Sequence, residues 1–554
     1  MEFMNLAKDK YKSAFDAVFE KIDTKATLIK DLDHLNRIAA AWVTTKTKYG
    51  TSVYNNERYF ARIKKYTKHT TFLRDDQITT TDLENVTKCV NKIPSDTEIY
   101  KLYILAGSGS QKQWIEMFFT PEGVKLAQVA EIMMKASFDK PKAEVTCKFL
   151  AVPEYQDLLG EQEPLELVYI PDKDNSYIFV GGTTYPGDVY KPLCKVLNAK
   201  VFANGGIEIH GAGISAHLGN SITDKTKENL IIISGLSLHG KTTLSVANIS
   251  DKQKMETAEK LGVEHSELKI ELKLLHDDYL YLMPGKNGCE IGVYAPNGIF
   301  PAMHKNKSDN LITSKPEAIL FNTNINDDGT PDFESDYLYK NRYSEEEKRT
   351  TNQRAAAPIR GSFQMPIVKS GRIQNPNEIV FITLTRDPAA PSAIRWQNIE
   401  DAVVYSAGLV VAPTDAVIDR VDGLYLNYMC TDFDVAPRTE FVKKMIEIFV
   451  NLKKSGTTIR CYTINTGKPD KEESLAVRDA IICDDGEWKS NTDLGIDYIA
   501  RCAGYESPYI PWETNPEVNW TKRWEETKRK RRDFFKTIGV ELGNSITKKL
   551  RALI

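Results

Sequence analysis

The chain has 554 residues. A single small hydrophobic core cannot organise a chain of this length, so we expect two large domains. Its 73 lysine and arginine residues nearly balance 76 aspartate and glutamate residues, and a net charge of -3 provides no field favouring nucleic acid or an anionic membrane as partner. No apolar run reaches the roughly 18 residues needed to cross a bilayer, so we expect no membrane segment.

The N-terminal part of the sequence predicts a helix. Apolar residues at Phe15, Val18, Phe19 and Ile22 are spaced by three and four, which is typical of an amphipathic helix. The same segment lacks the apolar core and cleavage site of an export signal. We therefore expect a cytoplasmic protein.

Beyond residue 97, short apolar runs alternate with helical stretches. Residues 121–136 predict a helix, and Pro121 and Glu122 suit its first turn. Strands, each closed by a turn that carries glycine or aspartate, are expected at residues 177–183, 229–235, 268–278, 378–387 and 458–467. This alternation predicts a mixed α/β protein.

The predicted domains are a substrate-side domain over residues 1–205 and a nucleotide-binding domain over residues 206–554. The polar, turn-rich segment 322–352 is expected to be a surface excursion. Eight cysteines are scattered along the chain without any pair spaced as Cys-x-x-Cys, which excludes the common zinc spacings and argues against a disulfide framework. We expect them to be reduced thiols.

A glycine-lysine motif follows the strand predicted at 229–235. The sequence GLSLHGKT, from Gly235 to Thr242, fits the phosphate-binding pattern G-x-x-x-x-G-K-[ST] between a strand and a helix. Glycines let backbone N–H groups face phosphates, Lys241 would bridge the β- and γ-phosphates, and the Thr242 hydroxyl would bind Mg²⁺. The residues predicted to bind the nucleotide are Gly235, Leu236, Ser237, Leu238, His239, Gly240, Lys241, Thr242 and Thr243. An ordinary strand–turn–helix is the alternative, and the motif alone does not select a reaction.

Several ordered segments over residues 170–485 resemble the ATP-dependent phosphoenolpyruvate carboxykinases. The family's GLSGTGKTTLS corresponds to GLSLHGKTTLS here, and its GGTWYGGE-x-KK corresponds to GGTTYPGDVYK. HDD stands in place of the family's GDD, TNQRAAAP in place of NTRAAYP, and CYTINTG in place of VWLVNTG. The resemblance implies a two-domain carboxykinase-like α/β fold with the phosphate-binding loop in the C-terminal domain.

The resemblance also implies the substrates and the site. Lys191, His210 and Asp278 match the family's Mn²⁺ ligands, and Arg354 matches the arginine that reaches the transferred phosphoryl group. Tyr185 would line the substrate pocket. The expected activity converts oxaloacetate and ATP to phosphoenolpyruvate, CO₂ and ADP, with Mn²⁺ and Mg²⁺ as cofactors. The expected partners are therefore a nucleotide and a small carboxylate. Independently, Asp277 and Asp278 end a strand after the loop, as a metal-binding acid does in P-loop proteins.

The chain departs from the family at the carboxylate-binding segment GRSPKD, which it lacks. Arg37, Arg58, Arg62 and Arg74 lie in the corresponding region, and Arg74 and Arg58 are the candidates to replace its arginine. A kinase acting on another acceptor and a catalytically silent nucleotide-binding protein therefore stay open as alternatives. The basic run KRKRR at 528–532 predicts a solvated helix face, with an acidic partner or a membrane surface as the other interpretation.

Overall fold

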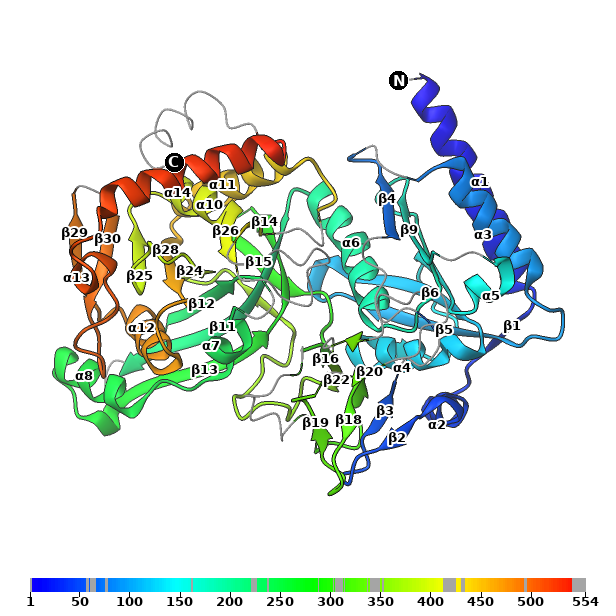
Figure 1. Ribbon diagram of the computed structural model, residues 1–554, viewed down its shortest axis with the longest axis horizontal. Helices are drawn as coiled ribbons and strands as arrows, with labels where there is room; N and C mark the ends of the chain where they lie inside the picture. The colour runs from blue at the N-terminus through cyan, green and yellow to red at the C-terminus, as the bar shows by residue number, and fades with distance from the viewer. Residues whose placement is uncertain are drawn as a thin grey trace. The chain divides into compact units, whose positions relative to one another are not determined.

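The computed structural model describes residues 2–55, 59, 66–74, 78–160, 163–220, 227–236, 239–286, 288–301, 303, 312, 314–335, 337–338, 349–350, 353–411, 425–429, 434–492 and 496–540. The chain forms two compact units (Figure 1). The first unit comprises Met1–Ala203 and Tyr294–Phe363, and the second comprises Asn204–Val293 and Gln364–Ile554.

This division differs from the expected continuous domains in one respect. Residues 294–363, which the sequence analysis placed in the second domain, belong to the first unit. The physical reason is strand pairing, because β17 (Ile319–Phe321) pairs in parallel with β3 (Ser52–Tyr54). The first boundary, between residues 203 and 204, lies close to the expected one.

The first unit is built around a sheet of eight strands. Its order is β1-β5-β6-β8-β10-β9-β4, with β7 paired to β5. The strands are β1 (Ala26–Leu28), β4 (Thr67–Thr71), β5 (Ile99–Ala106), β6 (Gln113–Phe119), β7 (Lys135–Ser137), β8 (Val145–Val152), β9 (Leu165–Ile170) and β10 (Ser176–Gly181). The helices of this unit are α1 (Glu2–Asp23), α2 (Leu32–Ala39), α3 (Thr80–Lys92), α4 (Val124–Met133), α5 (Tyr155–Leu159) and α6 (Gly187–Ala203), with short 3₁₀ turns η1 (Ala40–Trp42), η3 (Gly109–Gln111) and η4 (Pro121–Gly123).

A second sheet of the first unit carries part of the candidate site. Its order is β16-β22-β17-β3-β2, and it combines the N-terminal part of the chain with the returning segment. Its further strands are β2 (Thr45–Lys46), β16 (Gly298–Ile299) and β22 (Arg354–Pro358). Within the predicted excursion, two short hairpins join β18 (Asn324–Ile325) to β19 (Pro331–Asp332) and β20 (Tyr337–Leu338) to β21 (Arg349–Thr350).

The amphipathic pattern of the N-terminal helix places its apolar face in the core. In α1, Phe15, Val18, Phe19 and Ile22 are buried in one cluster with side chains of the eight-stranded sheet. The ring of Phe15 stacks on Tyr169 at 5.5 Å between centroids, one of several aromatic contacts there. The predicted helix at 121–136 is shorter in the structure, because η4 precedes α4 and Lys135 already belongs to β7.

The second unit is built around a sheet of eleven strands in the order β23-β15-β14-β11-β12-β24-β28-β25-β30-β29, with β13 paired to β11. The strands are β11 (Ile207–Asn220), β12 (Lys227–Ser234), β13 (Leu268–His276), β14 (Tyr279–Gly285), β15 (Gly288–Val293), β23 (Arg372–Gln374), β24 (Glu378–Thr385), β25 (Ala393–Trp396), β28 (Thr458–Asn465), β29 (Glu487–Asn491) and β30 (Ile496–Arg501), and β26 (Gly408–Val411) pairs separately with β27 (Tyr425–Tyr428). The helices are α7 (Lys241–Val246), α8 (Asp251–Leu261), α10 (Ile399–Ala407), α11 (Arg438–Lys454), α12 (Lys471–Cys483), α13 (Pro511–Thr514) and α14 (Trp520–Thr537), and η5 (His265–Glu267) precedes β13.

The buried centre of this sheet explains its apolar sequence runs. β12 pairs in parallel with β24, and β24 pairs in parallel with β28. Residues 230–233 of β12 are buried, as is typical of parallel strands that are covered on both faces. The mixed α/β class expected from the sequence is confirmed.

The basic run at 528–532 lies in α14, the red helix in Figure 1, and is only partly solvated. Lys528 and Arg531 are buried. The Arg531 guanidinium donates to Asp387 at 3.2 Å and to the Gly408 carbonyl at 3.1 Å, and it lies 3.9 Å from the centre of the Tyr405 ring. The expected solvated face is therefore wrong for these two residues, and Arg531 links α14 to Asp387 and to the Gly408 carbonyl.

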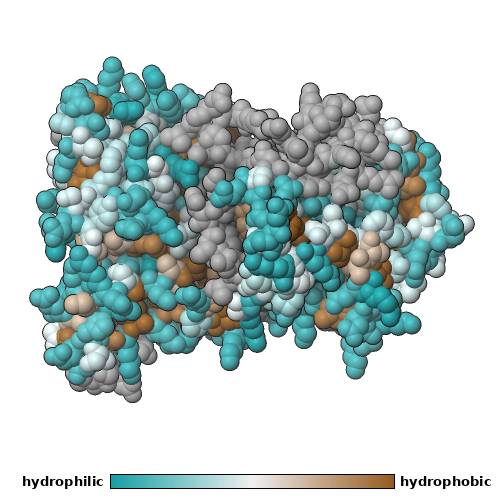
Figure 2. Space-filling model, turned by 60° about the horizontal axis from the view of Figure 1, so that its bottom comes forward, coloured by the Kyte–Doolittle hydropathy of each residue, from teal (hydrophilic) through white to brown (hydrophobic). Residues whose placement is uncertain are grey.

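Polar side chains cover most of the visible described surface in Figure 2, and apolar patches are interspersed among them. The large apolar residues that are exposed in the described part of the chain are Leu32, Tyr49, Met255 and Leu261. Over the same residues, none of the helices has both the length and the apolar character that a bilayer crossing requires.

Candidate functional site

The glycine-lysine loop connects β12 to α7 at the centre of the eleven-stranded sheet. Gly240 has φ 89°, a left-handed conformation that favours glycine. At Gly235, a Cβ atom would lie 2.9 Å from the Leu384 Cβ, so the close passage of the loop over β24 also requires glycine. His239 is buried, and its N–H donates to the Leu236 carbonyl at 3.3 Å. Ser237 and Leu238 lie outside the described residues.

Three predicted site residues of the second unit lie in one cluster. The Asp278 Oδ1 atom is 3.4 Å from His210 Nε2 and 3.2 Å from Lys241 Nζ. His210 comes from β11, Lys241 begins α7, and Asp278 lies in the turn between β13 and β14. The sequence analysis predicted all three as site residues, and the structure brings them together.

Strand pairing explains why these segments meet. The central strand β11 pairs with β12, β13 and β14, so the segments that carry all three residues adjoin it. The Gly211 N–H donates to the Asp278 carbonyl at 2.7 Å. His276 Nδ1 accepts from the backbone N–H of Asp278 at 3.2 Å, which fixes the turn that presents the carboxylate. The His210 ring also stacks on Tyr279, with centroids 4.6 Å apart.

The charges in this cluster keep Asp278 ionised. Burial tends to raise the pKa of the Asp278 carboxyl, but the Lys241 ammonium and the hydrogen bond with His210 outweigh burial and hold that pKa below its ordinary value. Lys241 itself is 7% exposed. The cluster thus presents a carboxylate, an imidazole and a partly desolvated ammonium at the start of α7.

Asp277, which the sequence places beside Asp278 at the end of the predicted strand as a candidate metal-binding acid, has a partner of its own. The Thr242 hydroxyl donates to its Oδ2 atom at 3.4 Å, and Asp277 is buried. The two neighbouring aspartates therefore face different partners, since Asp278 faces His210 and Lys241. Because successive side chains of an extended segment point to opposite sides, two adjacent aspartates at the end of a strand are expected to face different partners.

The chemistry of these side chains fits a divalent cation. An octahedral ion with bonds of about 2.1 Å holds neighbouring ligand atoms about 3 Å apart, close to the separation of His210 Nε2 and Asp278 Oδ1. Within the described ranges, no group of three or more His, Cys, Asp and Glu side chains is arranged to hold a metal ion. A metal at His210 and Asp278 would therefore need further ligands of another kind, such as an amine, water or substrate.

Arg478 anchors the helix that follows the loop. It is fully buried in α12, and its Nη1 atom donates to the carbonyls of Leu244 at 2.6 Å and Ala247 at 2.7 Å. Its Nη2 atom donates to the Asn248 carbonyl at 3.1 Å. Asp479 pairs with the guanidinium and accepts from the Ser250 N–H at 2.9 Å. The sequence analysis missed this pair, for which the signal was an Arg-Asp doublet within the apolar segment LAVRDAII.

We expect Arg478→Met to destabilise the protein by about 3–5 kcal/mol, because the change leaves Asp479 buried without its cation and removes the donors to three carbonyls. Chemical unfolding followed by tryptophan fluorescence measures the effect. The control is Arg501→Met, at an exposed position of β30, which should stay within about 0.5 kcal/mol of the parent protein. Equal stability of the two variants would contradict the anchoring role.

Two of the predicted site residues of the first unit lie around Phe300. The Arg354 guanidinium lies 5.4 Å from the centre of the Phe300 ring, and the Tyr185 ring lies 6.1 Å from it. Arg354 is the first residue of β22, and Tyr185 precedes α6. A Cβ atom at Gly187 would overlap the Tyr185 ring, which explains the glycine at that position. Phe300 carries no motif of its own, so sequence reasoning missed it.

Lys191 lies near the start of α6, just after its first turn, and is half-buried. Of the arginines considered for the carboxylate, Arg37 is exposed in the last turn of α2. Arg74 is half-buried in the turn after β4, where its N–H donates to Thr71 Oγ1 at 3.0 Å. Arg58 and Arg62 lie outside the described residues.

Comparison with known proteins identifies the class to which this fold and these residues belong. The model of the family described as phosphoenolpyruvate carboxykinase, of ATP-dependent type, matches residues 18–473. The chain belongs to this family. A relative from Aeropyrum pernix, named phosphoenolpyruvate carboxykinase (ATP), is 22% identical over 395 residues, which are 70% of this chain and 71% of that protein.

Proposed function

We propose that the protein catalyses the ATP-driven decarboxylation and phosphorylation of oxaloacetate to phosphoenolpyruvate. The observation that carries the proposal is the cluster of His210, Lys241 and Asp278 at the start of α7. It combines a phosphate-binding lysine with two metal-ligating side chains, as transfer of a phosphoryl group to a metal-stabilised anion requires. Membership of the carboxykinase family supports the same assignment.

Lys241 acts on the phosphoryl group. Without nucleotide its ammonium pairs with Asp278, and with ATP bound it would turn to the β- and γ-phosphates and neutralise the charge that develops during transfer. Thr242 and Asp277 are side by side, so the hydroxyl and the carboxylate would together hold the Mg²⁺ of the nucleotide, directly or through water. Gly235 and Gly240 let the loop backbone pass close to the phosphates.

His210 and Asp278 would hold the second cation, for which Mn²⁺ is the best fit because it accepts both imidazole and carboxylate ligands. Bound there, it would supply Lewis acidity at the negative charge that loss of CO₂ creates. Lys191 is a further predicted ligand on the strength of the resemblance alone. For that role its amine must be neutral, which requires a neighbouring cation to lower its pKa.

On the substrate side, Arg354 would stabilise the transferred phosphoryl group and Tyr185 would line the pocket for the carboxylate substrate. Their shared contact with Phe300 holds the guanidinium and the phenol ring in fixed positions. A planar guanidinium suits this role because it donates two parallel hydrogen bonds to one anion.

One observation keeps a second candidate function open, a kinase that uses the same phosphate-binding residues on another acceptor. The family's carboxylate-binding segment GRSPKD is absent from the sequence. A catalytically silent nucleotide-binding protein is the third alternative, but such a protein has no need of His210, Lys241, Asp278 and Arg354 together.

Incubating the purified protein with ATP, Mn²⁺ and oxaloacetate, and following phosphoenolpyruvate and CO₂, distinguishes these candidates. Binding of ATP and Mn²⁺ without any phosphoenolpyruvate would overturn the carboxykinase proposal.

If oxaloacetate is the substrate, Arg74→Ala or Arg58→Ala is expected to lower turnover at least about tenfold, roughly 1.4 kcal/mol of transition-state binding. Decarboxylation needs a guanidinium that fixes the plane of the carboxylate relative to the breaking C–C bond. Steady-state kinetics with varied oxaloacetate measures the effect, and ATP affinity should stay unchanged. Arg37→Ala, at an exposed position of α2, is the matched control. Parent-like kinetics in both test variants would rule out these two arginines.

A further inference from the structure

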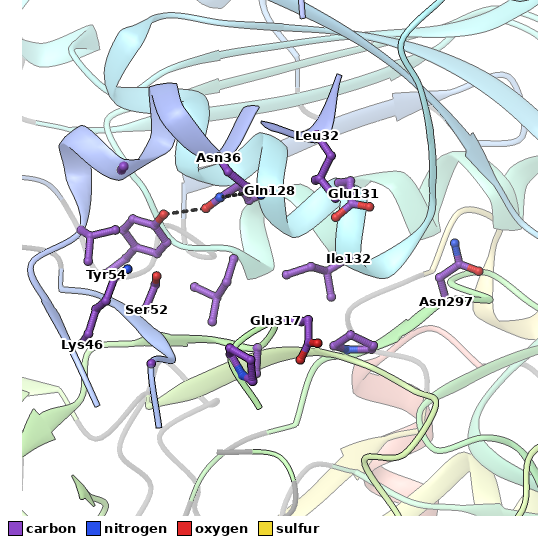
Figure 3. A pocket seen from close by; sticks show the side chains of 17 residues that line it. Leu32, Asn36, Lys46, Ser52, Tyr54, Gln128, Glu131, Ile132, Asn297 and Glu317 are labelled. Atoms are coloured by element: carbon purple, nitrogen blue, oxygen red, sulfur yellow. Dashed lines mark hydrogen bonds between the residues drawn. The ribbon is translucent and has the colours of Figure 1, made fainter. Parts of the chain in front are cut away.

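A cavity of about 640 Å³ lies within the first unit, formed by elements that carry none of the predicted nucleotide or metal ligands (Figure 3). Its walls come from α2, η1, β2, β3, α4, β17, β22 and the segments next to them. The volume is within the range of small-molecule sites, about 300–1,000 Å³.

Apolar side chains form a large part of the wall. Leu32, Val43, Ile132, Ile319 and Pro358 all line the cavity. Ile319 is buried in the sheet, whereas Leu32 is 43% exposed, which is high for a leucine. These surfaces would accept the apolar body of a ligand and remove it from water.

A hydrogen-bonded chain of polar side chains fixes one side of the cavity. The Tyr54 hydroxyl donates to Gln128 Oε1 at 2.5 Å, drawn as a dashed line in Figure 3, and Gln128 Nε2 donates to Asn36 Oδ1 at 2.8 Å. This chain links β3, α4 and α2, so the wall is organised before any ligand arrives. A preformed wall lowers the entropic cost of binding.

Two carboxylates, Glu131 of α4 and Glu317 before β17, line the same cavity (Figure 3). In the part of the chain that the structure describes, neither has a hydrogen bond or an ion pair. Glu131 is half-buried, and burial raises the pKa of its carboxyl. The one lysine among the lining residues, Lys46, is exposed and forms no ion pair with either carboxylate in the described structure. A half-buried carboxylate without a counter-charge favours a cationic ligand.

We propose that this cavity binds a small organic cation, an ammonium or guanidinium group carried on an apolar body. The charged group would pair with the half-buried Glu131, the exposed Glu317 being a second carboxylate of the same lining, and the apolar body would lie against Ile132 and Ile319. A bare metal ion fits less well, because two carboxylates supply too few ligands and the apolar walls offer none.

The test uses 2-phenylethylammonium as the probe and the full chain without nucleotide, metal or oxaloacetate. Isothermal titration compares it with 2-phenylethanol, which has the same apolar body and no charge, and with 3-phenylpropionate, which has the opposite charge. We expect the ammonium to bind at least about tenfold more tightly than the alcohol, and the carboxylate to bind more weakly than both. Because phosphoryl transfer plays no part in this measurement, failure of the proposed function would leave its result unchanged.

Two variants locate the binding. Glu131→Gln should abolish the preference for the ammonium over the alcohol, and Ala40→Phe, at an exposed position of the wall, should fill the cavity and weaken both probes. The matched control is Glu84→Gln, at an exposed position of α3 outside the cavity, which should bind like the parent. Equal affinity for ammonium and alcohol in the parent protein would overturn the proposal, as would unchanged ammonium affinity in both Glu131→Gln and Ala40→Phe.

Discussion

Replacing Lys241 with alanine is expected to lower phosphoryl transfer at least about a thousand-fold, equivalent to roughly 4 kcal/mol of transition-state stabilisation. The Lys241 side chain is 7% exposed, and Lys241 begins the helix that follows the glycine-lysine loop. In such a partly desolvated place, a positive charge stabilises the charge developing on the γ-phosphoryl group more strongly than it would in water. Alanine removes that charge completely.

Single-turnover kinetics with ATP and oxaloacetate, together with the nucleotide dissociation constant, measures the effect of Lys241→Ala. Circular dichroism should show an intact fold, since the backbone contacts of α7 to Arg478 do not involve the lysine side chain. The control is Lys252→Ala, at an exposed position of α8, which should retain full activity. Parent-like turnover of Lys241→Ala would show that the loop is not the phosphate-binding element.

The second large effect is expected at the proposed metal ligands, His210 and Asp278. Asp278→Asn and His210→Ala should each weaken Mn²⁺ binding at least about a hundred-fold. Loss of a residue that only orients a metal ligand already lowers metal affinity by up to about a hundred-fold, and loss of a ligand itself should lower the affinity at least as much. Activity in the parent protein should prefer Mn²⁺ to Mg²⁺, since imidazole suits the former better. Electron paramagnetic resonance of free Mn²⁺ during titration measures the affinity, and turnover with each metal measures the preference.

Asp277→Asn tests the division of roles between the neighbouring aspartates. Because Asp277 faces Thr242, this variant should chiefly weaken binding of the Mg²⁺–nucleotide complex and leave Mn²⁺ affinity near that of the parent. Asp251→Asn, at an exposed position of α8, provides a control for the loss of one negative charge. Unchanged Mn²⁺ affinity in both Asp278→Asn and His210→Ala would place the metal elsewhere.

Local sequence patterns predicted the strands well and their ends less well. β24 and β28 begin where expected, at Glu378 and Thr458, but each ends two residues before the predicted limit. The predicted strands included the turn residues, glycine and aspartate, that mark their ends. Such residues favour turns and do not take part in the hydrogen bonding between strands. For His210, Lys241 and Asp278 the ordered motifs sufficed to predict residues that lie together, because they flank adjacent strands of one sheet.

Features that depend on contacts distant in the sequence were not predictable in this way. The Arg-Asp doublet marks Arg478 as unusual within an apolar helix, but only the fold shows that its guanidinium contacts carbonyls at and after the end of α7. Phe300 can be recognised as part of the candidate site only from its contacts with Arg354 and Tyr185. In the basic run of α14, composition predicted a solvated helix face, whereas the burial of Lys528 and Arg531 depends on where the helix packs.

The parallel pairing of β3 with β17 also sets an order of events during synthesis on the ribosome. The sheet that contains β3 gains its neighbours β17 and β22 only after the chain has been extended through residues 319–321 and 354–358. Until then β3 presents an unpaired edge towards the missing β17, and such edges invite pairing with other chains. The first unit therefore remains incomplete during synthesis while the first part of the second unit is translated. A gene fragment that stops at residue 203 would encode a product lacking three strands of that sheet, β16, β17 and β22.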